Sequence, residues 1–296
     1  MVTFGLVQSG LVDAGSLQAR EAAREVVSSG FRPLDSLLPA GGIRRGSLVE
    51  WLAGGEIGGG AVTLAAAVAC RLVRADRRPA PAGGIGPRTI VVVDRSGGFH
   101  PPAVLPWLGT ESDGPQLVVA RPSRYEDEIW AIDQALRCSG VAAVLAWPRM
   151  EAVGDGLWPA AQRRSPPHAR QQWSIAMRRW QLAARSSGAV GLFVRSAAAR
   201  REPSWAEVRI AVAPLPGGTL LERRLRLERV GGAWSGAVGI GTSGCQAVEV
   251  VLDLEWGCAA VGRDGSGLSR SATGSRGAIV RPAPDGVERG ASCRAS

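Results

Sequence analysis

The stretch that decides the fold is SLVEWLAGGEIGGGAVT, which spans residues 47–63. Its first part, Ser47 to Leu52, is a mostly apolar run that predicts a strand. A glycine-rich turn follows from Ala53 to Gly60, and Ala61 to Ala75 is rich in Ala, Leu and Val, which favours a helix. Strand, glycine-rich turn and helix together are the setting of a nucleotide P-loop. The stretch therefore predicts the first β–α unit of an α/β domain.

The charged groups of a P-loop are missing from this turn. The motif G-x-x-x-x-G-K-[ST] supplies a Lys for phosphate and a hydroxyl for magnesium. Gly54 and Gly59 have the required spacing, but Gly60 then stands in place of the Lys and Ala61 in place of the Ser or Thr. Gly55 and Gly60 have the same spacing, and the residues after them are again apolar. In either register the turn lacks both groups.

The turn is accordingly interpreted as a degenerate P-loop that binds no cofactor. Its glycines are Gly54, Gly55, Gly58, Gly59 and Gly60. Backbone N–H groups at a helix N-terminus still favour weak anion binding, whereas Glu56 adds a negative charge to the loop. The alternative is that the glycines only form a tight turn between strand and helix.

Strands and helices alternate along the following part of the chain. Continuous apolar runs predict strands buried on both faces at Thr89–Asp94, Gln116–Ala120, Val141–Trp147 and Ala189–Arg195. Apolar residues at helical spacing predict helices at Tyr125–Ser139 and Gln171–Ser186. Alternating residues in Ala206–Val212 and around Leu225 predict an antiparallel hairpin with one solvated face, joined across Pro214–Gly218. The predicted fold class is α/β, a mostly parallel sheet flanked by helices with a C-terminal antiparallel hairpin.

We expect three parts along the chain. Residues 1–27 hold an N-terminal helix, which a Ser cap predicts for Ser16–Val27. Residues 28–239 form the core, with a long loop at Glu151–Arg170. Residues 240–296 are a Gly/Ser/Arg-rich tail that we expect to be largely disordered, although Val248–Leu254 has the pattern of one more strand.

Composition narrows the possible partners. The net charge is +9, and all 35 basic residues are Arg, which favours nucleic acid or an acidic partner but also fits a GC-rich coding sequence. The five cysteines form no C-x-x-C pair, and with two histidines they predict no metal site. No run approaches 18 apolar residues and the first residues do not resemble a signal peptide, so we expect no membrane association and a cytoplasmic protein.

The segment before the first strand carries a family resemblance. Residues 28–42 read SSGFRPLDSLLPAGG, and Gly46 and Val49-Glu50 follow. The pattern resembles the entry into the core of the RecA recombinase family, in which an S/T-G-x-x-x-L-D element precedes the P-loop strand. It is most similar to ImuA, the RecA-like partner of the ImuB pseudo-polymerase in bacterial mutagenic translesion synthesis. The resemblance implies a RecA-like P-loop NTPase fold from about Val26 to Arg229.

The resemblance also implies that the catalytic groups are lost. The catalytic Glu of the family corresponds to Ser96, after the strand Thr89–Asp94. The magnesium-binding Asp corresponds to Trp147, and the nucleotide-sensing Gln lies where Arg195 and Ser196 stand. We therefore expect a protein that is not an enzyme.

Two loops correspond to the DNA-binding loops of the family. Glu151–Arg170 corresponds to the first, and Ser196–Ser204 is a shortened counterpart of the second. The candidate DNA or partner contacts are Arg163, Arg164, Arg170, Arg200 and Arg201. The alternative is that these arginines only form solvated loops.

The expected function is a non-catalytic adaptor in SOS-induced, error-prone translesion synthesis that links RecA and the ImuB-type pseudo-polymerase, with weak nucleic-acid binding possible. Tryptophans are frequent in binding hot spots, and the candidates here are Trp158, Trp173, Trp180, Trp234 and Trp256. One alternative is a SulA-like inhibitor that binds the tubulin-like division protein. Another is a RecA-superfamily ATPase with an atypical nucleotide site.

Overall fold

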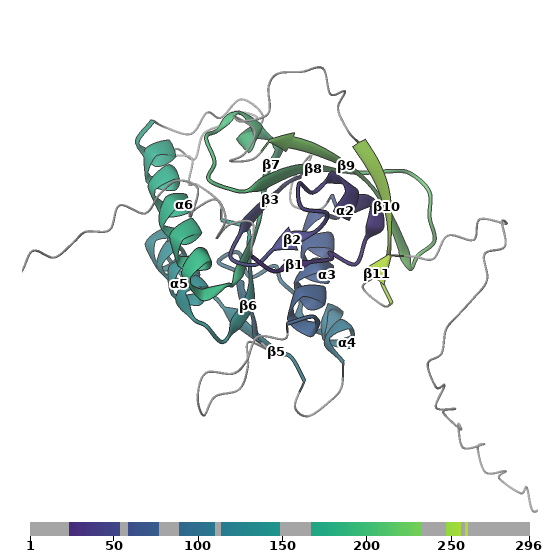
Figure 1. Cartoon of the computed structure of the whole chain (residues 1–296), viewed down its shortest axis with the longest axis horizontal. Coiled ribbons are helices and arrows are strands. Elements are labelled where there is room, and N and C mark those ends of the chain that lie inside the picture. Colours follow the sequence, from purple (N-terminus) through teal and green to yellow (C-terminus); the bar gives the residue numbers. More distant parts are fainter. Residues whose placement is uncertain are drawn as a thin grey trace, which may run out of the picture. The chain divides into compact units, whose positions relative to one another are not determined.

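A mixed sheet organises the chain in the computed structural model (Figure 1). The structure describes residues 24–53, 59–76, 89–109, 114–148, 167–231, 247–255 and 258–259. Within them the strands of this sheet lie in the order β11-β10-β9-β8-β3-β7-β6-β4-β5. Their bounds are β3 Leu48–Ala53, β4 Thr89–Val93, β5 Gln116–Ala120, β6 Val141–Ala146, β7 Val190–Ser196, β8 Val208–Pro214, β9 Glu222–Gly231, β10 Ala247–Asp253 and β11 Cys258–Ala259.

The sheet has a parallel part and an antiparallel part. In the parallel part, each strand pairs in parallel with the next one in the order β5, β4, β6, β7, β3, β8. Strand β9 then runs antiparallel to β8, and β10 runs antiparallel to β9. The α/β class, the mostly parallel sheet and the C-terminal hairpin are thus confirmed.

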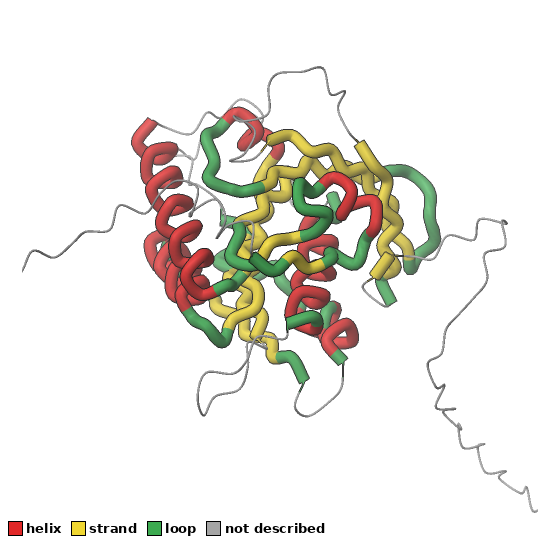
Figure 2. The backbone as a smooth tube through the Cα atoms, viewed as in Figure 1, coloured by secondary structure: helices red, strands yellow, loops and turns green. Residues whose placement is uncertain are grey.

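Helices cover both faces of the parallel part, as Figure 2 shows. Helix α3 (Ala61–Arg74) packs on one face together with α4 (Leu105–Leu108), while α5 (Tyr125–Arg137) and α6 (Pro167–Ser187) pack on the other. Alternate residues of β3 serve the two faces: Trp51 joins the core under α3, and Leu48 joins the core under α5 and α6. Among the described residues, no helix is long and apolar enough to span a membrane.

The first described residues correct the prediction of an N-terminal helix to Val27. Val26–Val27 form the short strand β1, which pairs antiparallel with β2 (Ile43–Arg44). Val27 is buried, so the pairing also closes one side of the core. Helix α2 (Arg32–Leu37) connects these two strands in the chain, and Pro33 stands in its first turn. Most of the predicted helix, residues 16–23, lies outside the described residues.

Three further boundaries differ from prediction. Helix α6 begins at Pro167, so the predicted loop to Arg170 ends earlier, at a proline in the first helical position. Strand β5 is an edge strand with a half-exposed surface, because only β4 pairs with it, and is not buried on both faces. Arg209 of β8 is buried instead of solvated, because β8 lies inside the sheet between β3 and β9.

The boundary placed at residue 239 is also wrong as a limit of the ordered core. Strand β10 pairs with β9 along its length, and its side chains Val250 and Leu252 are buried in the main core. A strand was expected at Val248–Leu254, and its apolar alternate residues explain why it joins the sheet. Residues from Gly262 onward lie outside the described residues.

Candidate functional site

The candidate site lies where the carboxyl ends of four parallel strands meet. Strands β3, β7, β6 and β4 are neighbours in this order and run in the same direction. Ligands of open α/β sheets bind at this edge, because the loops that follow the strands gather there. The positions that the resemblance assigns to nucleotide chemistry lie at the ends of these strands or in the segments that follow them.

At the start of α3, the position of the P-loop Lys is filled by packing. Gly60 is the N-cap residue of α3 and has a left-handed φ of 81°. A Cβ atom added there would lie 2.5 Å from Cδ2 of Leu225, which reaches the turn from β9 and is itself buried. Any side chain at this position would collide with Leu225 and strain the backbone. Gly54, Gly55 and Gly58 lie outside the described residues.

The described residues around Gly59 and Gly60 enclose a small cavity of about 150 Å³. It faces the β8–β9 hairpin, and its other lining residues are Pro214, Leu215, Gly217, Thr219, Glu222, Arg223, Arg224 and Leu225. Pockets for drug-sized ligands and cofactors usually measure about 300–1,000 Å³. Beside the described residues Gly59 and Gly60, the hairpin thus leaves a space that fits a few waters or a small ion.

Beyond β4 and β6, the two residues at the catalytic positions contact one another. Trp147, directly after β6, donates from Nε1 to Oγ of Ser96 at 3.0 Å. Ser96 in turn donates to Oδ1 of Asp94 at 2.8 Å. The chain of hydrogen bonds ties the ends of β4 and β6 together. The sequence resemblance assigns the magnesium-binding and water-activating positions to Trp147 and Ser96, respectively.

Asp94 is the carboxylate closest to this chemistry, and it is fully engaged. Its side chain is buried and also accepts from the backbone N–H of Phe99 at 2.8 Å and of Gly98 at 3.3 Å. The ring of Phe99 packs on Trp147 with centroids 5.9 Å apart. Asp94 therefore serves as the cap of a loop, and the described residues contain no cluster of three His, Cys, Asp or Glu that could hold a metal.

Near the end of β7, Arg195 belongs to a buried ion-pair network that sequence reasoning missed. The carboxylate of Glu50, fully buried in β3, accepts from Arg195 at 3.1 Å and from Nε of Arg209 at 2.7 Å. Arg195 also pairs with Glu202 and lies over the ring of Trp173, 4.1 Å from its centroid. The signal was Glu50 itself, a carboxylate within an apolar strand, which requires a buried cation beside it.

The network is completed by the short helix η3 (Ala197–Arg201). Arg209 donates to the backbone oxygens of Ala199 at 2.5 Å and Glu202 at 3.1 Å. Ser196, at the sensor position, caps η3 by accepting from the N–H of Ala198 at 3.3 Å. Arg195 and Ser196 thus both make structural contacts, one as an ion pair and the other as a helix cap.

The candidate arginines are not brought together as one site in the described part. Arg200 and Arg201 lie on η3 and are exposed, and Arg200 pairs with Glu228 of β9 at 3.1 Å. Arg163 and Arg164 lie outside the described residues, and for Arg170 only the helical backbone is described.

Two of the proposed contact tryptophans are core residues. Trp173 and Trp180 of α6 are fully buried and meet edge to face with ring centroids 5.3 Å apart. Trp158, Trp234 and Trp256 lie outside the described residues. Sequence reasoning overlooked Trp130, 63% exposed on α5, and Trp205, 38% exposed after η3. Trp130 lies off the apolar face of α5, which Ile132 and Leu136 form, and this position in the helical pattern would have identified it as a surface residue.

The fold and the site define an α/β protein in which side chains contact one another beyond β4 and β6 and Leu225 lies close to Gly60. Comparison with known proteins finds no family model that matches the chain. It finds no matching curated protein either.

Proposed function

We propose that this chain is a non-catalytic, RecA-like adaptor that joins RecA to an ImuB-type pseudo-polymerase during SOS-induced translesion synthesis. The sequence resemblance at residues 28–42 supports the family. The mostly parallel sheet flanked by helices is consistent with the coarse α/β fold that the resemblance implies.

The hydrogen bond between Ser96 and Trp147 is the observation that carries the proposal. In the alignment implied by the resemblance, these residues replace the catalytic Glu and the magnesium-binding Asp. A Ser that accepts from an indole and donates its only proton to Asp94 keeps one neutral lone pair, which lacks the negative charge of the carboxylates that it and Trp147 replace. The side chains that replace the catalytic groups thus form a stable contact of their own.

The packing of Leu225 against Gly60 supports the same conclusion from a second element. A P-loop Lys cannot be accommodated there, and without it a bound nucleotide loses most of its charge stabilisation. A protein that has a RecA-type core but lacks this chemistry can still bind other proteins through the surfaces of the core. We therefore assign it an adaptor role.

Tagged co-purification after DNA damage tests this function. The full chain is expressed in its own cells, and the bound proteins are identified by mass spectrometry. We expect RecA and an ImuB-type pseudo-polymerase, enriched over undamaged cells. Recovery of the tubulin-like division protein alone would replace the proposal with the SulA-like alternative, and recovery of no repair protein would refute it.

A nucleotide assay separates the adaptor from an atypical ATPase. Pure protein with Mg-ATP is expected to give background hydrolysis and no saturable heat in calorimetry. The control is Gly59→Asp, which adds a negative charge beside the N-terminus of α3. Hydrolysis above background that is lost in Gly59→Asp would establish an ATPase and remove the proposal's main support.

A further inference from the structure

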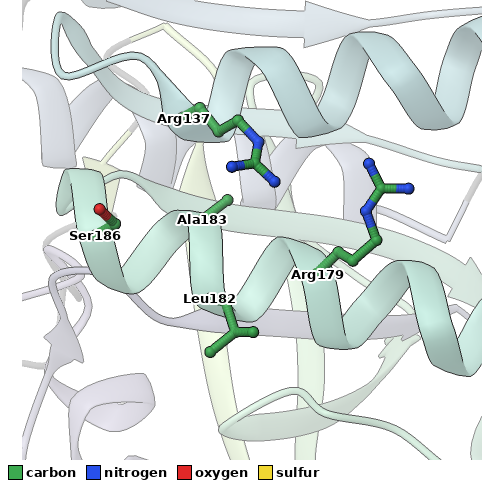
Figure 3. A pocket seen from close by; sticks show the side chains of 5 residues that line it. All are labelled: Arg137, Arg179, Leu182, Ala183 and Ser186. Atoms are coloured by element: carbon green, nitrogen blue, oxygen red, sulfur yellow. The ribbon is translucent and has the colours of Figure 1, made fainter. Parts of the chain in front are cut away.

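The surface formed by α5 and α6 combines exposed apolar side chains with arginines. The two helices run in parallel, because α5 leads into β6 and α6 leads into its parallel neighbour β7. Hydrogen bonds from Arg179, Trp180 and Ser187 of α6 join them to α5. Where both helices end, they enclose an open groove of about 400 Å³ (Figure 3). Its lining residues are Arg137, Arg179, Leu182, Ala183 and Ser186.

In the described part of the chain, two arginines of the groove share one carboxylate. Arg137 donates to the buried carboxylate of Asp133 at 2.8 Å, and Arg179 donates to the same carboxylate at 3.3 Å. Figure 3 shows these two guanidinium groups reaching from α5 and α6 toward one another. One carboxylate balances only one arginine, so the cluster keeps one positive charge. Each guanidinium also keeps N–H donors, because an Arg has five.

Exposed apolar residues extend from this groove along α6. Leu182 is 50% exposed, and Ile175 lies seven residues earlier on the same face and is 56% exposed. Two turns separate them, a distance of about 10 Å. Arg178 lies between them, with its guanidinium 4.6 Å from the ring centroid of Trp205, which extends the apolar surface. Trp205 and Arg178 in this stripe are residue types that are enriched in protein–protein hot spots.

We infer that the α5/α6 groove, with the stripe from Ile175 to Leu182, binds an acidic amphipathic helix of a partner protein. The spacing of Ile175 and Leu182 fits the i, i+3/i+4, i+7 anchors of a helix laid across a groove. Carboxylates on that helix would take the free donors of Arg137 and Arg179, which suit bidentate pairing. Phosphates of a nucleic acid could use the arginines, but they gain nothing from the two aliphatic side chains.

The inference deepens the proposed function and rests on it, because it names the face through which the adaptor would hold a partner. Photo-crosslinking tests it directly. Ser186, which is exposed and lines the groove, is replaced by p-benzoyl-phenylalanine in the full chain. Cells are damaged and irradiated, and the cross-linked peptide is sequenced. Leu220 on the β8–β9 hairpin, 98% exposed, receives the same probe as the control position.

We expect the Ser186 probe to capture a segment of another protein with Asp or Glu flanking apolar residues at helical spacing. The Leu220 probe should not capture that segment. Capture of a basic segment, of nucleic acid, of this chain itself or of nothing would overturn the inference. If the segment has the expected chemistry but belongs to a protein outside DNA repair, the docking surface stands and the proposed function falls.

Affinity then tests the two components of the surface. The captured segment is synthesised with a fluorescent label and titrated with purified full-length protein by anisotropy. Leu182→Asp is expected to weaken binding by tenfold or more, on the order of a hot-spot loss. Leu220→Asp is the matched control and should leave binding unchanged.

The charge is tested separately with Arg179→Gln, which leaves Arg137 on Asp133 and so preserves the buried carboxylate's partner. We expect severalfold weaker binding and a reduced dependence on salt. The control is Arg226→Gln, an exposed arginine on β9. Equal affinity of all four variants and the unmodified protein would refute the surface even if a cross-link forms.

Discussion

The substitution Gly60→Ala tests whether packing has replaced the phosphate site. Gly60 has a φ of 81°, and in this left-handed region a residue with a Cβ atom costs about 1–2 kcal/mol. The added Cβ would also lie 2.5 Å from Cδ2 of Leu225, so this buried side chain must move. Overpacking of this kind costs about 1–3 kcal/mol. We expect Gly60→Ala to lower the free energy of unfolding by about 2–5 kcal/mol.

Equilibrium unfolding in urea measures this loss and separates its two causes. Gly41→Ala is the matched control, because Gly41 has a φ of 70° and an added Cβ would meet nothing within 4 Å. It should lose only the backbone part, about 1–2 kcal/mol. In the background of Leu225→Ala, Gly60→Ala should likewise lose only that part. The double-mutant cycle should therefore give a coupling of about 1–3 kcal/mol.

The result that refutes the reasoning is a coupling within about 0.5 kcal/mol of zero, which is the range for residues that do not interact. Gly60→Lys, which restores the motif residue, extends the test to function. It should destabilise the protein at least as much as Gly60→Ala and should not produce Mg-ATP binding. Saturable Mg-ATP binding by Gly60→Lys would show that the site is open.

Three other predictions follow from the buried groups. Glu50→Leu should cost about 3–5 kcal/mol in urea unfolding, because it leaves two buried arginines without their shared carboxylate. Trp147→Phe should cost about 1 kcal/mol in the same assay, since it removes the hydrogen bond to Ser96 but keeps an aromatic ring. Burial raises the pKa of Cys70 to about 12, so a thiol reagent at pH 8 should modify exposed Cys138 and leave Cys70 unreacted until the protein unfolds.

Each of these predictions has a control. Glu228→Leu removes the half-buried partner of exposed Arg200 and should cost less than about 1 kcal/mol. If Glu50→Leu cost no more than Glu228→Leu, the buried network would be contradicted. Trp205→Phe, at a half-exposed indole, should be close to neutral. The thiol assay uses a variant in which Cys245, Cys258 and Cys293 are Ser, and rapid modification of two thiols in the folded state would contradict the burial of Cys70.

The sheet was predictable because its parallel strands are long apolar runs. Gln116–Ala120 and Val141–Ala146 were found almost residue for residue, since a continuous apolar run with turns on both sides permits few other structures. Strand β1 was missed because two residues carry no periodicity, and only their pairing with Ile43–Arg44 makes them a strand. The exposure of β5 was missed because position in the sheet is not visible in a single run.

The site was predictable as a set of losses but not as a set of contacts. Sequence alone identifies that Ser96 and Trp147 stand where charged groups are expected. It does not reveal that the two side chains meet, because they are 51 residues apart and their contact depends on the neighbouring positions of β4 and β6. Leu225 reaches Gly60 for the same reason, through the order of strands in the sheet.

The ion pairs of Glu50 can form only late during synthesis of the chain. Its two arginine partners lie 145 and 159 residues later in the chain. At about 5–20 residues per second, the ribosome completes them roughly 7 to 30 seconds after β3 has been made. Until then β3 has neither of its neighbouring strands, β7 and β8. The centre of the parallel sheet therefore cannot form until both have been made, and β9 and β10 can join it only afterwards.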